Sequence, residues 1–310
     1  MIRALIFITL FICTSVFSQN LSEKELIIHS EKVTLNGTLL TVNLKEKTPL
    51  VILIPGSGPT DRNGNNVASK NNSLKLLAEG IAKKGISSFR YDKSVLSFKK
   101  DDNLKIDSLT FENFINDTKA VIAHFKNENN YSKIIVAGHS QGSLVGIVAS
   151  ENKVDGFISL AGAGRSIDEV ITEQIEKQAP FLVDETKQIL EQLKKGNTID
   201  DYNPMLISLF NKSVQPFLIS WIKYNPQEEI KKLNIPILII NGSKDIQVKN
   251  SDAELLHKAN PTSKLELIKN MNHLFKEIKG DLNENIASYN NPELPVMTEL
   301  VEAMSNFIKK

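Results

Sequence analysis

The amino-acid sequence predicts an α/β fold in which a mostly parallel β-sheet carries helices on both faces. Short, continuous apolar runs such as LVILI at Leu50–Ile54 alternate along the chain with amphipathic segments of helical length. Strands that are buried on both faces of a parallel sheet have this appearance. The chain has 310 residues, of which 41% are hydrophobic and 24% are charged, so it can bury a large core in one domain or in two.

The first expected element has a different pattern. Apolar and polar side chains alternate through Leu26–Leu44, on either side of Asn36-Gly37. Asn-Gly is the strongest two-residue hairpin signal, because both central positions of that turn need a positive φ. We therefore expect an antiparallel hairpin that turns at Asn36-Gly37, ahead of the parallel strands.

The parallel part of the sheet follows in a regular order of strands and helices. Thr110 is a suitable N-cap for one of these helices, because its hydroxyl can accept a hydrogen bond from the first turn. Strands are expected at Leu50–Ile54, Ile86–Tyr91, Lys133–Ala137, Val154–Leu160, Ile235–Ile240 and Lys264–Ile268, and helices at Ser73–Lys84, Thr110–Lys126, Gln141–Ser150, Ser251–Ala259 and Val296–Ile308.

This alternation is interrupted between residues 163 and 233, where the sequence has helical patterns and several prolines but no convincing strand. Alternating strands and helices on both sides of the interruption indicate one sheet that is completed after it. We expect a core domain formed by residues 19–162 and 234–310, with a helical cap of residues 163–233 inserted into it.

The first twenty residues have the layout of a secretory signal peptide. Arg3 precedes an apolar run from Ala4 to Cys13, and small and polar residues follow. We expect cleavage after Ser18, so that residues 1–18 are the signal peptide and the mature chain is periplasmic or secreted. The apolar run is shorter than the about 20 residues of a membrane-spanning helix. Acylation of Cys13, as in a lipoprotein, is disfavoured by the bulky Ile12 before it.

Charge and cysteine content exclude several classes of site. The formal net charge is +1, and duplex nucleic acids are bound by strongly basic surfaces, so no nucleic-acid partner is expected. Cys13 is the one cysteine, and its loss with the signal peptide leaves the mature chain without a thiol nucleophile or a disulfide. The histidines and carboxylates show no metal-ligand spacing, and neither a metal nor an organic cofactor is expected.

The sharpest motif is Gly138-His139-Ser140-Gln141-Gly142, a G-x-S-x-G sequence between a predicted strand and a predicted helix. This context is the one that a nucleophile elbow requires, because a strained strand-to-helix turn lifts the serine hydroxyl above the carboxyl end of the sheet. There the first amides of the helix face developing negative charge. Ser140 is therefore the candidate nucleophile, and the alternative is a simple Gly-Ser turn.

A serine hydroxyl needs a base, and the base needs a carboxylate that orients it. In folds with this elbow the carboxylate and then the histidine follow the serine along the chain. Asp245 and His273 each follow a predicted strand, at the edge of the sheet where Ser140 is expected. We select them over Asp252, which has the position of a helix-start residue, and over His257, which lies within a predicted helix.

A tetrahedral intermediate also needs amides that bind its oxyanion. The glycine-rich loop Pro55–Asn65 follows the first buried strand, and we expect the backbone amide of Ser57 to act there together with that of Gln141. Gly58 is the second choice. Asp61 and Arg62 are expected either to brace this loop or to contact a substrate.

Several of these stretches together resemble the EstD-like capped bacterial carboxylesterases, which have the α/β-hydrolase fold. The resemblance covers nearly the whole mature chain. It implies a serine ester hydrolase with Ser140, Asp245 and His273 as its catalytic triad. Related sequences often have Arg-Gly after Tyr-Asp-Lys, whereas this chain has Ser94-Val95. The stretches are GSGPTDRNGN (Gly56–Asn65), GHSQG (Gly138–Gly142), SVQPFLISWIKYNP (Ser213–Pro226), IPILIINGSKDIQV (Ile235–Val248) and MNHLFK (Met271–Lys276).

The implied reaction is hydrolysis of a small carboxylic ester of short to medium acyl chain, through an acyl-enzyme intermediate. A serine peptidase, a thioesterase or an acyltransferase would use the same residues, and a binding module without catalysis is the alternative from another class. The apolar residues of the insert either line an acyl or alcohol site or pack the insert onto the core. They are Phe217, Leu218, Trp221, Ile222 and Tyr224.

Overall fold

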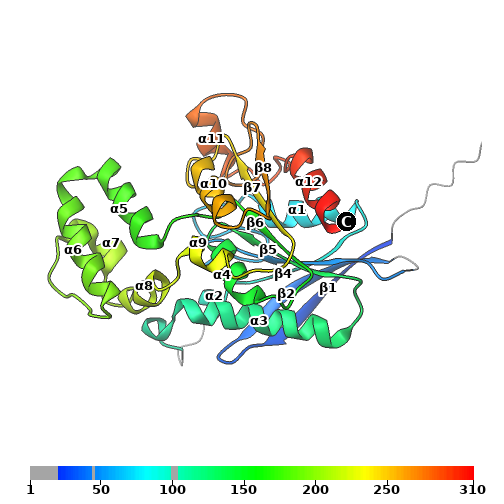
Figure 1. Cartoon of the computed structure of the whole chain (residues 1–310), viewed down its shortest axis with the longest axis horizontal. Coiled ribbons are helices and arrows are strands. Elements are labelled where there is room, and N and C mark those ends of the chain that lie inside the picture. The colour runs from blue at the N-terminus through cyan, green and yellow to red at the C-terminus, as the bar shows by residue number, and fades with distance from the viewer. Residues whose placement is uncertain (1–19, 44–45, 99–103) are drawn as a thin grey trace, which may run out of the picture.

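A computed structural model describes residues 20–43, 46–98 and 104–310 of the chain. The expected signal peptide and Cys13 lie outside the described residues. Eight strands form one sheet in the order β1-β2-β4-β3-β5-β6-β7-β8 (Figure 1). They are β1 (Asn20–His29), β2 (Thr34–Asn43), β3 (Leu50–Ile54), β4 (Ser87–Tyr91), β5 (Ile134–His139), β6 (Gly156–Leu160), β7 (Ile237–Gly242) and β8 (Lys264–Ile268).

From β4 to β8 neighbouring strands run parallel. Within the described residues, the antiparallel pairings are those of β1 with β2 and of β2 with β4. The prediction of a mostly parallel sheet is therefore confirmed. The central strands β3, β4, β5, β6 and β7 are buried along their whole length. This explains why they consist mainly of apolar and small residues, with Arg90 of β4 and His139 of β5 among the buried exceptions.

The antiparallel hairpin exists, but its predicted turn is wrong. The chain turns between β1 and β2, where the amide of Ser30 donates a 2.9 Å hydrogen bond to the carbonyl of Val33. Asn36-Gly37 lies inside β2 and pairs with Ile27 and Leu26 of β1. A Cβ atom at Gly37 would stand 2.2 Å from the ring of Phe89. Gly37 is thus needed because the ring of Phe89, on β4, packs directly against its backbone. The local sequence around Gly37 does not indicate this contact.

Helices cover both faces of the sheet. Apolar side chains of α1 and α12 join one buried cluster on one face. Those of α3, α4, α10 and α9 (Pro226–Ile230) join another on the opposite face. Thr110 forms a capping box with Asn113 at the start of α3. The helices of the core are α1 (Ser73–Ala82), α2 (Val95–Phe98), α3 (Phe111–Glu128), α4 (Gln141–Ser150), α10 (Asn250–Ala259), α11 (Leu282–Ser288) and α12 (Thr298–Ile308).

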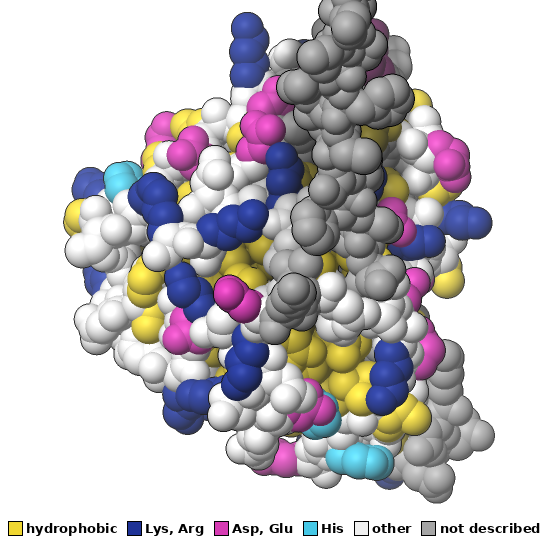
Figure 2. Space-filling view, turned by 90° about the vertical axis from the view of Figure 1, so that its right-hand side faces the viewer, with side chains coloured by type: hydrophobic (Ala, Val, Ile, Leu, Met, Phe, Trp, Pro, Cys, Tyr) yellow, Lys and Arg dark blue, Asp and Glu magenta, His cyan; other side chains and the backbone are white. Residues whose placement is uncertain are grey.

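A helical insert connects β6 to β7. Its helices α5 to α8 form a lobe beside the sheet, at the left of Figure 1, and this lobe has a buried apolar cluster of its own. The insert contains α5 (Ile167–Gln178), α6 (Val183–Lys194), α7 (Ile207–Phe210), α8 (Gln215–Ile222) and α9 (Pro226–Ile230). Figure 2 shows Lys and Arg side chains interspersed with Asp and Glu on one face of the molecule. Among the described helices, none has the length and hydropathy that crossing a bilayer requires.

Candidate active site

Ser140 lies where β5 ends and α4 begins, in a backbone conformation that few non-glycine residues adopt. Its φ is 54° and its ψ is −121°. The backbone amide of Ser140 donates a 2.9 Å hydrogen bond to the carbonyl of Leu160 on β6, which anchors the turn to the sheet. A strained residue of this kind persists only where its surroundings hold it, and such residues cluster at functional sites.

The two glycines of the G-x-S-x-G motif make this turn possible because other backbone segments pack directly against them. A Cβ atom at Gly138 would lie 2.1 Å from the carbonyl oxygen of Gly142, and one at Gly142 would lie 2.6 Å from that of Pro55. Both contacts are with backbone atoms, which cannot move aside as a flexible side chain can. The motif therefore packs the start of α4 directly against β5 and against the loop after β3.

Asp245 and His273, 28 residues apart in the chain, form a hydrogen-bonded pair. The imidazole Nδ1 of His273 donates to Oδ2 of Asp245 at 2.7 Å, and the two side chains are 3% and 0% exposed. The other carboxylate oxygen accepts the amides of Gln247 and Val248 at 2.8 and 2.9 Å. Those amides fix the position of the carboxylate. The carboxylate in turn holds the proton of His273 on Nδ1, so that Nε2 is the ring nitrogen that remains available to other groups.

The parallel register brings these residues to one edge of the sheet. Ile54 of β3 lies opposite Gly138 of β5, and Gly242 of β7 lies opposite Ile268 of β8. The loops that follow these strands therefore leave the sheet side by side. Ser140 and His273 line the same cavity, of about 110 Å³, together with Ser57.

His139, the neighbour of Ser140, supports the loop that carries His273. Its Nε2 donates a 2.9 Å hydrogen bond to the backbone carbonyl of His273, and the two rings are 4.7 Å apart. Burial, assisted by repulsion from His273 and Lys93, lowers the pKa of His139 to about 3. His139 is therefore neutral at neutral pH and acts as a hydrogen-bond donor rather than as a charge.

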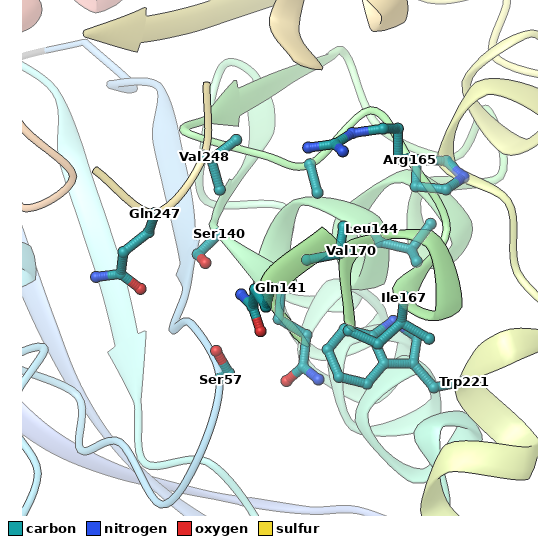
Figure 3. Close-up of a pocket in the computed structure, with 13 residues that line it drawn as sticks. Ser57, Ser140, Gln141, Leu144, Arg165, Ile167, Val170, Trp221, Gln247 and Val248 are labelled. Atoms are coloured by element: carbon teal, nitrogen blue, oxygen red, sulfur yellow. The ribbon is translucent and has the colours of Figure 1, made fainter. Parts of the chain in front are cut away.

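Ser57, Ser140 and Gln141 line a second cavity, of about 140 Å³, and Figure 3 shows them together on one side of it, with Trp221 opposite. Within the described part of the chain, the amides of Ser57 and Gln141 have no acceptor. Amides left free beside a strained serine can bind an anion. The neighbouring Gly58 has a φ of 76°, a conformation in which glycine has no steric cost.

Asp61 and Arg62 brace the loop that contains Ser57. The carboxylate of Asp61 accepts the amides of Asn63 and Asn65 at 2.8 and 2.9 Å. The guanidinium of Arg62 binds both oxygens of Asp92, at 3.0 and 2.8 Å, and it also pairs with Glu25. Of the two roles expected for these residues, the contacts thus correspond to bracing.

A third cavity, of about 250 Å³, is formed between the core and the helical insert. Gly58, Phe217 and Trp221 line it, and so do Ser57 and Gln141. The other candidates from the insert pack elsewhere: Leu218 lies in the core of the insert, and the ring of Tyr224 is 5.4 Å from that of Phe111. Trp221 also stacks on Phe111, with ring centres 5.6 Å apart, so it combines packing with lining the cavity.

Two basic residues at the site were not predicted from the sequence. Arg165 lines the 140 Å³ cavity beside Ser140, and both of its bonds to Asp252 measure 2.9 Å. These bonds, together with an ion pair to Glu173, raise its pKa. Lys93 is buried behind the loop that carries Ser57. Its place in the sequence, just beyond the end of β4 and at the same edge of the sheet as Ser140, was the available signal.

The sequence is similar to that of a known esterase. The chain is 29% identical to esterase EstD from Thermotoga maritima over 260 residues, which cover 80% of this chain and 60% of that protein. The chain thus spans about 60% of the length of that curated relative. No family model matches the sequence.

Among solved structures, Est1E from Butyrivibrio proteoclasticus is similar with a TM-score of 0.58, 18% identity, and coverage of 92% of this chain and 99% of that one. The Pyrococcus furiosus esterase Pf2001 has a TM-score of 0.55 and 16% identity, with coverage of 93% and 91%. At this identity the likeness concerns the fold. With its mostly parallel sheet and the inserted helices, the chain has the α/β-hydrolase fold, and its sequence is similar to that of an esterase.

Proposed function

We propose that the chain is a carboxylic ester hydrolase that acts through a Ser140-His273-Asp245 triad. The observation that carries the proposal is the 2.7 Å hydrogen bond between His273 and Asp245, buried beside a serine whose φ is 54°. A histidine oriented by a carboxylate next to a strained, accessible serine is the arrangement that activates a hydroxyl group for acyl transfer. The similarity to an esterase supports the same reaction class.

In the proposed mechanism, Nε2 of His273 takes the proton of Ser140 as the hydroxyl oxygen attacks the ester carbonyl. Asp245 stabilises the imidazolium that forms, and the same proton is then delivered to the leaving alcohol. A water molecule, deprotonated by His273, then attacks the acyl-enzyme. The bond between the acyl carbon and the Ser140 oxygen breaks, that oxygen takes the proton back from His273, and the carboxylic acid is released. The amides of Ser57 and Gln141 hold the oxyanion in both tetrahedral intermediates.

The cavities suggest where the two parts of the ester bind. The leaving alcohol must lie near His273, because His273 protonates it, and the cavity lined by His273 also contains the polar side chains of Asn71, Gln247 and Tyr289. The acyl group then occupies the 250 Å³ cavity, which is lined by Phe114, Phe217, Trp221 and other apolar side chains. A cavity of this size accepts a short to medium acyl chain.

Replacement of Ser140 by alanine tests the proposal. We expect Ser140→Ala to lower the turnover of p-nitrophenyl butyrate by about 10⁴-fold or more, because the nucleophile is lost. Ser150→Ala is the matched control, since Ser150 lies at the other end of α4, where its hydroxyl bonds to the carbonyl of Gly146. The control should keep its activity. A fully active Ser140→Ala variant would refute the assignment.

The same preparation distinguishes the other reaction classes. A fluorophosphonate probe should label the wild type and Ser150→Ala but not Ser140→Ala, and a chain that binds esters without catalysis would remain unlabelled. Turnover is then compared on acyl esters, acyl thioesters and aminoacyl anilides of matched acyl size. Ester hydrolysis should be fastest. A clear preference for anilides or thioesters would replace the proposal by a peptidase or a thioesterase.

A further inference from the structure

Lys93 is a buried basic residue that the proposed triad does not use. Its side chain lies behind the loop that carries Ser57, and the residue is only 4% exposed. Its amino group donates a 2.6 Å hydrogen bond to the carbonyl of Gly56 and another to the side-chain oxygen of Gln141. It also lies 4.4 Å from the centre of the Phe114 ring. Among the described residues, no carboxylate forms an ion pair with it.

These partners place Lys93 next to both amides that are expected to hold the oxyanion. The carbonyl of Gly56 and the amide of Ser57 belong to the same planar trans peptide, so they point in opposite directions. A hydrogen bond that fixes the carbonyl therefore fixes the direction of the Ser57 N–H. The same bond polarises the peptide and strengthens its N–H as a donor.

Gln141 is the second residue that Lys93 holds. Its side chain accepts from Lys93, while its backbone amide begins α4 next to Ser140. Lys93 thus connects the loop after β3, through the carbonyl of Gly56, with the first turn of α4, through the side chain of Gln141, and these partners lie 37 and 48 positions from it in the chain. The backbone amide of Lys93 also donates to the carbonyl of Thr60, and the hydroxyl of Thr60 donates to the carbonyl of Ser57 at 2.8 Å.

We propose that Lys93 is a positioning residue of the oxyanion hole, which aligns the amides of Ser57 and Gln141 by binding the Gly56 carbonyl and the Gln141 side chain. This inference rests on the proposed esterase function. Burial of an amino group without a carboxylate partner is costly. This burial lowers the pKa of Lys93 to about 7. A role in catalysis explains why a lysine occupies this buried position, although its burial does not stabilise the fold.

Lys93→Met tests the inference, because methionine has a similar length but no donor. We expect kcat for p-nitrophenyl butyrate to fall about 100-fold, as for loss of an oxyanion contact, while KM stays within about threefold. Affinity for a trifluoromethyl ketone, whose adduct with Ser140 carries an oxyanion, should fall in parallel with kcat. Lys276→Met is the matched control, since Lys276 is equally buried and binds the carbonyl of Leu294. It should leave kcat and the affinity for the trifluoromethyl ketone, each per labelled site, within about threefold of the wild-type values.

End-point labelling by a fluorophosphonate gives the concentration of folded, reactive sites in each sample. Wild-type protein that is neither labelled nor active would refute the proposed function itself. Labelled Lys93→Met with wild-type kcat, or with a lower kcat but unchanged affinity for the ketone, would refute the role of Lys93 alone. If Lys93→Met does not fold, Gln141→Met is the second variant, because it removes the acceptor of Lys93 on α4. It should lower kcat about tenfold and leave KM nearly unchanged.

Discussion

The neutral state of His139 makes a specific prediction about stability in acid. His139 has a pKa of about 3 in the folded protein because burial disfavours its charged form, whereas an exposed histidine has a pKa of about 6.5. Between these two values the unfolded chain binds a proton that the folded chain does not. Stability contributed by neutral His139 is therefore complete above pH 6.5 and is lost as the pH falls towards 3.

The size of this effect follows from the two pKa values. The full difference of about 3.5 pKa units corresponds to about 5 kcal/mol, of which about 2 kcal/mol is lost between pH 7 and pH 5. His139→Gln should remove this dependence, because the glutamine amide can donate to the carbonyl of His273 as Nε2 does but does not titrate.

The assay is urea unfolding of the wild type and of His139→Gln, followed by circular dichroism at pH 7, 6 and 5. The free energy of unfolding of the wild type should fall more steeply with acid, so that the difference between the two proteins changes by about 2 kcal/mol from pH 7 to pH 5. Parallel pH dependences of the two proteins would show that His139 is not held neutral in the folded state, which would contradict the prediction.

Two other substitutions test the site. Asp245→Asn should lower kcat about 10⁴-fold with a small change in melting temperature, because it removes the charge that orients and stabilises His273; an activity close to that of the wild type would exclude Asp245 as the acid. Trp221→Ala should shift the preference of p-nitrophenyl esters towards longer acyl chains, because Trp221 lines both the 140 and the 250 Å³ cavities; an unchanged chain-length profile would mean that Trp221 serves packing alone.

The sheet could be predicted from the sequence because its central strands are buried on both faces. Such strands favour apolar or small residues on both faces, and β3 and β7 show this as nearly continuous apolar runs. The helix α4 and the strand β8 begin and end at the predicted residues. The short helix α11, which starts at Asp281 as its N-cap, was not predicted, because seven residues give little periodicity.

The hairpin turn shows where local patterns mislead. Asn36-Gly37 has the composition of a tight turn, but Gly37 is required by the ring of Phe89, 52 positions further along the chain. The turn itself is formed by Ser30–Val33, which has no glycine. A glycine signals either a positive φ or a close approach, and only the neighbours in space decide between these meanings.

The sequence predicts the candidate triad but not the residues that support it. Ser140, Asp245 and His273 each follow a strand, and in a parallel sheet that position alone predicts which edge they reach. His139, Lys93 and Arg165 act through partners that the sequence does not mark: a carbonyl 134 positions away for His139, one 37 positions away for Lys93, and a carboxylate 87 positions away for Arg165. Their roles depend on packing, so they become visible only in three dimensions.

The neutral state of His139 also has an electrostatic consequence for the proposed mechanism. In the proposed mechanism His273 must become an imidazolium, 4.7 Å from the ring of His139. A second positive charge at that distance would oppose this step. Burial and the nearby Lys93 both lower the pKa of His139, so the residue that holds the His273 loop does so without a charge. His139 thus aligns the loop of His273 as a neutral donor, and Asp245 is the carboxylate that is hydrogen-bonded to His273 and would stabilise the imidazolium in the proposed mechanism.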